Sequence, residues 1–222
     1  MAYPTVSAPY GLQPINRFDG MPYAGATQQL PIASTYNTAI YNGDIVNIAS
    51  GGTVAKSTVT VDSTTAAANY TAGVFMGCQY TSATTGQLTF SQYYPASLAV
   101  KSGSTILAFV ADDPDQLFKV ALVAGQTEDG NGLTIAFLGR TVIGSNLELV
   151  QNSGSSVTGD SKIGAYSAAG ATTTDTLPLR CIDVVPDTAN SSGNFCEVIV
   201  KWNAANVSGL TGGHQYLNPT GV

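Results

Sequence analysis

The chain has 222 residues, of which only 10% are charged, and its formal net charge is −6. A chain of this length can bury one good core, in one domain or at most two small ones. Its eight Lys and Arg residues cannot make the concentrated basic face that nucleic-acid phosphates require, so the composition argues against direct binding of DNA or RNA.

The first 36 residues are expected to form an extended arm. Prolines recur through this stretch, where they remove backbone donors and disfavour a helix or a central strand. Large apolar side chains lie between them, which a disordered linker would avoid. We therefore predict an interface with neighbouring subunits or a shell beneath, made by Tyr3, Pro4, Tyr10, Leu12, Pro14, Phe18, Pro22 and Tyr23. The alternative is an N-terminus that packs on its own domain.

Residues 37–206 are expected to form an all-β body, either a meandering barrel or a sandwich. Runs rich in β-branched and aromatic residues alternate with turn signals such as Asn42-Gly43 and Thr85-Gly86, and helical periodicity is nearly absent. The expected strands cover residues 38–41, 44–48, 53–61, 73–80, 87–93, 105–110, 118–123, 133–138, 147–150, 179–185 and 197–202. A Gly-, Ser- and Thr-rich excursion is expected at 153–176, and a C-terminal extension at 207–222. No repeat recurs at a fixed period.

The densest acidic run predicts one helical turn, at residues 113–118. Asp113 would cap it and Pro114 would take the first helical position. Calcium binding by Asp112, Asp113 and Asp115 is the alternative, although the run lacks the ligand spacing of a known calcium loop. Metal binding by the loop at 128–132 is a further alternative.

No group of residues predicts catalysis or a cofactor. His214, the one histidine, follows two glycines that would not hold it rigidly, so we expect it exposed or packed at an interface. The three cysteines have no metal-ligand spacing and are expected to be buried free thiols, with a pair between Cys181 and Cys196 as the alternative. Trp202 is expected in the core rather than on a glycan platform.

The beginning of the chain has no basic and apolar secretory signal, and no stretch reaches the roughly 20 apolar residues that cross a bilayer. Folding in the cytoplasm is therefore expected.

Several short segments resemble virion structural proteins of tailed bacteriophages, notably those of marine and cyanobacterial phages. They are residues 10–14, 43–46, 73–80, 112–118, 177–180 and 197–202. Within that group the chain looks most like capsid decoration, or cement, proteins.

The resemblance implies an all-β protein that binds the outer surface of an assembled shell. Its implied partners are the major capsid protein and further copies of itself, often as homotrimers, with no catalytic residues and no cofactor. One alternative is the major capsid protein, which would normally need a long helix that this sequence does not offer. Another is a host-binding tail or fibre protein that grips carbohydrate through Trp202 and surface tyrosines.

Overall fold

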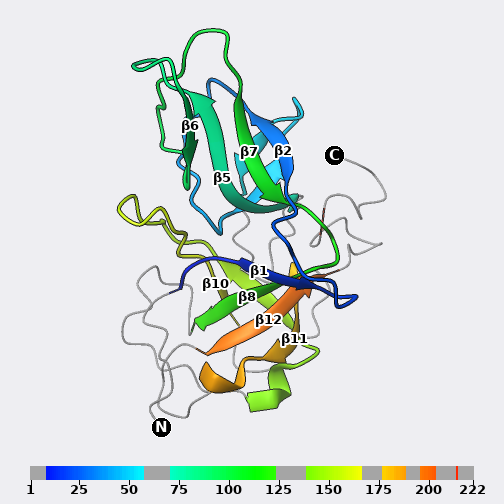
Figure 1. Ribbon diagram of the computed structural model, residues 1–222. Helices are drawn as coiled ribbons and strands as arrows, with labels where there is room; N and C mark the ends of the chain where they lie inside the picture. Colours follow the sequence, from blue (N-terminus) through cyan, green and yellow to red (C-terminus); the bar gives the residue numbers. More distant parts are fainter. Residues whose placement is uncertain are drawn as a thin grey trace.

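The computed structural model describes residues 9–57, 71–123, 139–166, 177–188, 196–203 and 214. They form two β-sheet lobes, one above the other in Figure 1, which we call the N-terminal lobe (upper) and the C-terminal lobe (lower). Within these ranges there is no α-helix, only strands and two short 3-10 helices, Gly139–Val142 and Pro186–Thr188. The predicted all-β fold is confirmed. No helix of the described part is long and apolar enough to span a membrane.

The C-terminal lobe is a closed barrel of five strands. Its order is β8-β10-β9-β11-β12, and β12 pairs again with β8. Strands β10 and β8 are parallel, and all other neighbours are antiparallel. The bounds are β8 (Gln116–Val123), β9 (Asn146–Val150), β10 (Gly164–Tyr166), β11 (Leu179–Val184) and β12 (Glu197–Trp202). Strand β1 (Gln13–Arg17) is added to this ring by antiparallel pairing with β8.

The N-terminal lobe contains a similar ring. Its order is β3-β4-β2-β7-β5, and β3 pairs again with β5. Strands β2 and β4 are parallel and meet at a single residue pair, Ile32 and Val54. The bounds are β2 (Gln28–Ile32), β3 (Ile45–Ile48), β4 (Val54–Lys56), β5 (Gly73–Thr81) and β7 (Ile106–Ala111), with β6 (Leu88–Ser91) added outside β5.

Two hydrophobic cores fill the lobes, and they are joined. The core of the N-terminal lobe contains Phe75 and Tyr94. The core of the C-terminal lobe contains Trp202 and also Ile45 and Val74, which come from strands β3 and β5 of the other lobe. Because apolar burial is shared across the junction, the two lobes stabilise each other.

The two lobes have the same strand connectivity. Strands β2, β3, β4, β5 and β7 correspond in chain order to β8, β9, β10, β11 and β12. In each lobe the first strand pairs with the third in parallel. The third strand also pairs with the second, and the second pairs with the fourth. The fourth strand then pairs with the fifth, and the fifth returns to the first.

The residue register repeats as well as the connectivity. Leu30 pairs with Ala108 in the N-terminal lobe as Val120 pairs with Val198 in the C-terminal lobe. The fourth strand of each lobe has one extra residue opposite the fifth strand, Met76 in β5 and Ile182 in β11, at equivalent places in the ladder. A bulge at the same place in both lobes identifies them as a structural repeat.

The turn before the second strand of each lobe is repeated too. Its glycine has a positive φ, +88° at Gly43 and +84° at Gly144, a conformation that glycine adopts without steric cost. Gly43 donates its N–H to the carbonyl of Phe75 at 2.8 Å, and Gly144 donates to the carbonyl of Cys181 at 2.9 Å. Phe75 and Cys181 hold equivalent positions, each directly before the extra residue of its strand.

Most of the predicted strands are confirmed. The expected strands at 44–48, 73–80, 87–93, 105–110, 118–123, 147–150, 179–185 and 197–202 coincide with β3, β5, β6, β7, β8, β9, β11 and β12 within a few residues, and the run at 53–61 contains β4. The run at 38–41 is no strand, since only Ile40 forms an isolated bridge, with Tyr94. The run at 133–138 lies outside the described residues, and β10 falls inside the predicted excursion.

The predicted helical turn at 113–118 is wrong. Gln116 donates its N–H to the carbonyl of Asp113 at 3.1 Å, which closes a tight turn with Pro114 and Asp115 at its centre, and β8 begins at Gln116. The side chain of Asp113 accepts the N–H of Asp115 at 2.8 Å. An Asp followed by Pro is as favourable in a β-turn as at a helix start. Here the chain continues as strand β8, so the turn forms instead of a helix.

The described part of the predicted arm, residues 9–36, is built into both lobes instead of extending from them. It contributes β1 to the C-terminal lobe and β2 to the N-terminal lobe. Pro14 is tolerated because the register with β8 shifts directly after it, and the other side of β1 is bridged only further along, at Asn16. Pro31 is tolerated because β2 contacts β4 only at the next residue, Ile32.

Candidate interaction surface

The residues predicted as an interface lie in three different environments. Tyr3 and Pro4 lie outside the described residues. Leu12 is fully buried in the chain's own core and donates its N–H to the carbonyl of Gly43 at 3.0 Å. Pro14 pairs with Phe118 in the β1–β8 ladder. These contacts match the alternative in which the N-terminus packs on its own domain.

Tyr10 binds the N-terminal segment to the barrel wall. Its hydroxyl donates to Glu197 Oε1 at 2.5 Å, and Lys119 Nζ lies 3.2 Å from the same oxygen and 5.5 Å from the centre of the tyrosine ring. Burial and the hydrogen bond to Glu197 raise the pKa of Tyr10 above its usual value. Tyr10 therefore stays a protonated donor, committed to its own chain.

Phe18, Pro22 and Tyr23 belong to a hairpin that leads away from β1. Arg17 donates its N–H to the carbonyl of Met21 at 2.8 Å, which closes the hairpin tip, defined here as residues 17–22. Tyr23 is half-buried against the C-terminal core, whereas Phe18 is 58% and Met21 59% exposed. Among the predicted interface residues that the structure describes, only Phe18, at this tip, presents a large apolar side chain to solvent.

Charged pairs surround the hairpin tip. Arg17 Nε lies 3.1 Å from Asp113 Oδ2, and Lys201 Nζ lies 2.9 Å from Asp115 Oδ1 and 4.6 Å from the centre of the Phe18 ring. Asp113 and Asp115 of the acidic run are thus used in ion pairs, and Asp113 also in the turn. Within the described residues, no three His, Cys, Asp or Glu side chains are grouped so that they could hold a metal, and the loop at 128–132 lies outside them.

A second apolar surface, which the sequence did not lead us to expect, covers the outer side of the N-terminal lobe. We call it the outer face, and it consists of Gln29, Pro31, Gln79, Thr81, Leu88, Phe90, Leu107 and Phe109. Leu88 is 60% and Phe90 66% exposed, and the ring of Phe90 stacks on that of Phe109 at 6.3 Å. Strands β2, β5, β6 and β7 contain no charged residue.

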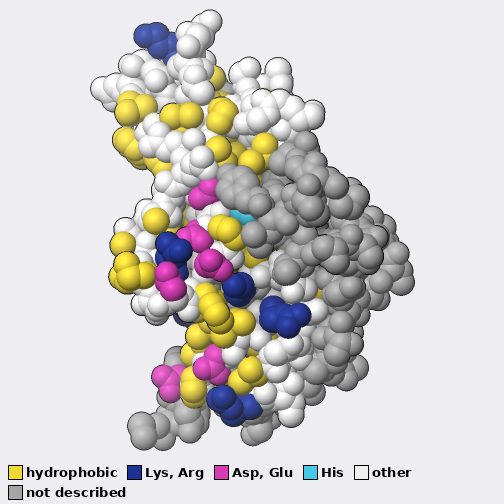
Figure 2. All heavy atoms as spheres, turned by 90° about the vertical axis from the view of Figure 1, so that its right-hand side faces the viewer, with side chains coloured by type: hydrophobic (Ala, Val, Ile, Leu, Met, Phe, Trp, Pro, Cys, Tyr) yellow, Lys and Arg dark blue, Asp and Glu magenta, His cyan; other side chains and the backbone are white. Residues whose placement is uncertain are grey.

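Equivalent positions of the C-terminal lobe are charged. Register places Lys119 where the N-terminal lobe has Gln29, and Glu197 where it has Leu107. Figure 2 shows the same separation: hydrophobic and uncharged side chains dominate the upper lobe, and most Lys, Arg, Asp and Glu gather over the lower lobe. A signal was present in the sequence, because the strands predicted at 73–80, 87–93 and 105–110 all lack charge.

The junction between the lobes is organised by a buried carboxylate. Asp44 is fully buried, and its oxygens accept from Lys56 Nζ at 2.8 Å, the Ser161 hydroxyl at 2.6 Å and the Tyr41 N–H at 2.9 Å. Asn42 adds a parallel bridge to Asp160. Because Ser161 and Asp160 belong to the C-terminal half of the chain, these bonds connect the two lobes.

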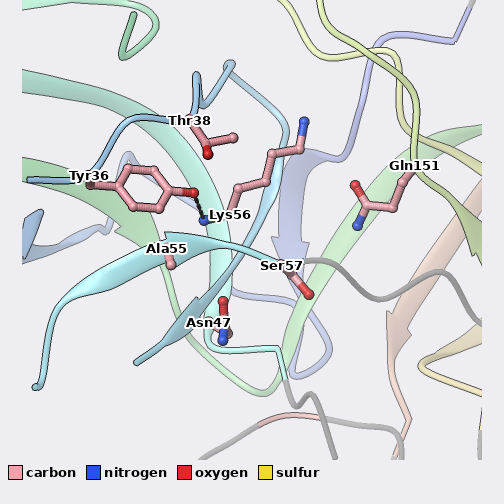
Figure 3. Close-up of a pocket in the computed structure, with 7 residues that line it drawn as sticks. All are labelled: Tyr36, Thr38, Asn47, Ala55, Lys56, Ser57 and Gln151. Carbon is pink, nitrogen blue, oxygen red and sulfur yellow. Dashed lines mark hydrogen bonds between the residues drawn. The ribbon is translucent and has the colours of Figure 1, made fainter. Parts of the chain in front are cut away.

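Beside this junction lies an open pocket of about 610 Å³, lined by Tyr36, Thr38, Asn47, Ala55, Lys56, Ser57 and Gln151. Figure 3 shows Gln151 facing it from the side opposite Tyr36, whose hydroxyl accepts the backbone N–H of Lys56 at 2.8 Å. Lys56, the one charged side chain of this lining, is already paired with Asp44. The pocket therefore presents the amides of Asn47 and Gln151 and three hydroxyls, but no uncommitted charge among these residues.

The remaining reactive side chains are buried. His214 is fully buried with its ring 6.0 Å from that of Trp202, so of the two expected placements, exposed or packed at an interface, the exposed one is wrong. Burial lowers the pKa of His214 to about 4. The cysteines are buried and free, and burial raises the pKa of Cys78 and Cys181 to about 12, so these thiols stay protonated. Trp202, 1% exposed, belongs to the core, as predicted, and offers no platform for a glycan.

Comparison of the chain with protein-family models, with curated proteins and with solved structures finds no match.

Proposed function

We propose that this chain is a capsid decoration protein of a tailed bacteriophage, which binds the outer surface of the assembled shell and bridges neighbouring subunits. The observation that carries the proposal is the presence of two separate exposed apolar surfaces, the hairpin tip on one lobe and the outer face on the other. A protein that bridges neighbours needs at least two contact surfaces. The sequence resemblance to virion structural proteins supports the same function.

The proposed shell contact is the hairpin tip, because it combines exposed Phe18 and Met21 with charged groups that can bind polar partners at its rim. The major capsid protein is the proposed partner. Each contact is weak alone, but many copies on one particle add their binding free energies, which any rupture of the shell must overcome. The homotrimer implied by the resemblance stays a prediction, and it is the alternative to the two-fold dimer proposed below.

Cryo-electron microscopy of virions from the phage that carries this sequence tests the proposal. We expect density for the two lobes across the outer shell. Density only at the tail or fibres would instead support host binding, and density forming the continuous shell would identify the major capsid protein. Either result, or the absence of the chain from the particle, would refute the proposed function.

A binding experiment tests the contact itself. Particles depleted of this chain are mixed with the purified protein and sedimented, with F18S/M21S as the variant. We expect shell binding to weaken by roughly 30- to 100-fold, because burial of each side chain contributes on the order of 1 kcal/mol. Val157, which is 93% exposed elsewhere on the C-terminal lobe, provides the control variant V157S. Equal binding by F18S/M21S and V157S would exclude the hairpin tip as the contact.

A further inference from the structure

Strand β6 is an unprotected edge of the N-terminal sheet. It pairs with β5 on one side, and its other side has no partner strand among the described residues. Its four residues, Leu-Thr-Phe-Ser, include no charge and no proline. Natural edge strands are usually protected by charges, by proline, by a bulge or by being very short, and of these devices β6 has only its shortness. An edge without charge, proline or bulge is suited to receive another strand.

The hydrogen-bonding pattern shows which backbone groups are available. Ser82 donates its N–H to the carbonyl of Gln87 at 3.0 Å, so this pair is a hydrogen-bonded one. Hydrogen-bonded and non-hydrogen-bonded pairs alternate along an antiparallel ladder. Thr89 and Ser91 therefore bond toward β5, and the N–H and C=O groups of Leu88 and Phe90 point away from it.

We propose that β6 pairs with β6 of a second copy of this chain, antiparallel about a two-fold axis through Thr89. In this register Leu88 lies opposite Phe90 of the other copy, and each such pair exchanges both of its N–H···O bonds. The same pairing places the exposed side chains of Leu88 and Phe90 from both copies on one face, where they form cross-strand aromatic and aliphatic contacts.

Charge favours a second copy as the occupant. The chain has a net charge of −6, yet β2, β5, β6 and β7 carry no charge, so two acidic copies meet here without placing like charges opposite each other. The strand is also self-complementary, since its two outward-facing residues match each other in antiparallel order. The contact is separate from the hairpin tip and does not depend on the proposed function.

The expected affinity is modest. Two short strands and their side chains bury less than the roughly 1,600 Å² of a standard interface, so a dissociation constant in the micromolar range is expected. Sedimentation velocity of the full chain between about 1 and 300 µM should show a concentration-dependent monomer–dimer equilibrium. A species that remains monomeric throughout would overturn the proposal.

Two variants block the edge in different ways. F90K places a charge beside the two-fold axis, and L88P removes an N–H that points outward, so each should weaken dimerisation at least tenfold. F90L retains the apolar contact and should restore the dimer. F18K, at a residue of similar exposure on the other lobe, is the matched control and should dimerise normally. Equal dimerisation of F90K, L88P and the unaltered protein would overturn β6 pairing.

A cysteine placed at the axis tests the register. Thr89 faces its own counterpart in a non-hydrogen-bonded pair, whose Cα atoms lie about 4.5 Å apart, close enough for a disulfide. T89C should form a disulfide-linked dimer under mild oxidation, whereas S91C, displaced from the axis, should not. Since the three native cysteines are buried, the unaltered chain serves as the control. A trimer in place of a dimer, or crosslinking of S91C but not T89C, would contradict the proposed geometry. If F90K fails to dimerise but still binds capsids, the β6 contact and the shell contact are different surfaces.

Discussion

The two lobes share one pairing scheme but present different surfaces. Several equivalent core positions are apolar in both, such as Leu30 and Val120, or Val110 and Val200. Equivalent outer positions differ in charge, as Gln29 and Lys119 do. The comparison shows that buried positions and turn geometry specify the ring of strands, whereas the outer side of the same ring is free to change its chemistry.

The lobes also differ in what is added to the ring. The C-terminal lobe receives β1 on β8, with Tyr10 bound to the barrel wall, and the N-terminal lobe receives β6 on β5. The first addition is made by a segment from the start of the chain and anchors it. The second leaves an apolar edge in solvent, which is why we place the copy-to-copy contact there.

Deletion of residues 1–26 tests whether the C-terminal ring is stable without β1. The deletion removes buried Leu12 and the Tyr10–Glu197 hydrogen bond, so the free energy of unfolding should fall by about 5 kcal/mol or more. Urea titration followed by circular dichroism measures the change. An unchanged midpoint would show that this segment is a detachable arm and that the five-stranded ring of the C-terminal lobe is stable without β1. The ring of the N-terminal lobe has no counterpart of β1 in the described part of the chain.

Replacement of Asp44 tests the junction between the lobes. D44N removes the charge that pairs with Lys56 inside the protein, and should lower the free energy of unfolding by about 3–5 kcal/mol. The equivalent residue of the C-terminal lobe is Ser145, so S145A is the matched comparison and should cost about 1 kcal/mol. Equal effects of the two substitutions in thermal or urea unfolding would mean that Asp44 has no special role in joining the lobes.

Stability should decrease in acid because of His214. Its pKa is about 4 in the folded protein and near 6.5 when unfolded, so the unfolded chain binds the extra proton between these values. The histidine's contribution is complete above pH 6.5 and is lost as the pH falls toward 4, by up to about 3 kcal/mol. Urea midpoints of the unaltered protein and H214Q across this range measure it. If the urea midpoints of both proteins fell equally with pH, the loss of stability in acid would not be due to His214.

A smaller difference is expected between two tyrosine hydroxyls, one in each lobe. Y10F removes a hydrogen bond to the Glu197 carboxylate and should cost about 1.5–2 kcal/mol, because bonds to charged acceptors are stronger. Y36F removes a hydrogen bond from the Lys56 backbone and should cost about 1 kcal/mol. Thermal melts compare the two variants. A larger loss for Y36F would reverse the ranking of the two contacts.

Most of the strand content could be predicted from local patterns, although β10 lies inside the stretch expected to be an irregular excursion. The uniformly apolar run in β7 and the alternation of polar and apolar residues in β9 and β12 are visible in the sequence, because strand formation depends on side chains a few positions apart. Strands β1 and β2 were missed because they contain Pro14 and Pro31, which a local argument reads as strand breakers. The hairpin tip was predicted in part, through Phe18 and Pro22, but the outer face was missed. Exposure of the outer face depends on which side of each strand the rest of the fold covers.

The repeat could not be found in the sequence. Equivalent residues differ in type at most positions, as Phe75 and Cys181 do, and the separation between equivalent strands changes because the connecting segments differ in length. Apolar residues of different shape can fill similar cores if volume and patterning are kept, so a shared ladder leaves little trace in residue identity.

The sequence by itself determined the all-β class, the buried cysteines and tryptophan, and the scarcity of charge. Tertiary structure alone decided that residues 9–36 belong to both lobes, that two rings repeat one register, and that Leu88 and Phe90 remain exposed while Leu12 is buried. The physical reason is that local propensity depends on neighbours in sequence, whereas pairing and burial depend on strands that are distant along the chain and meet only in the folded protein.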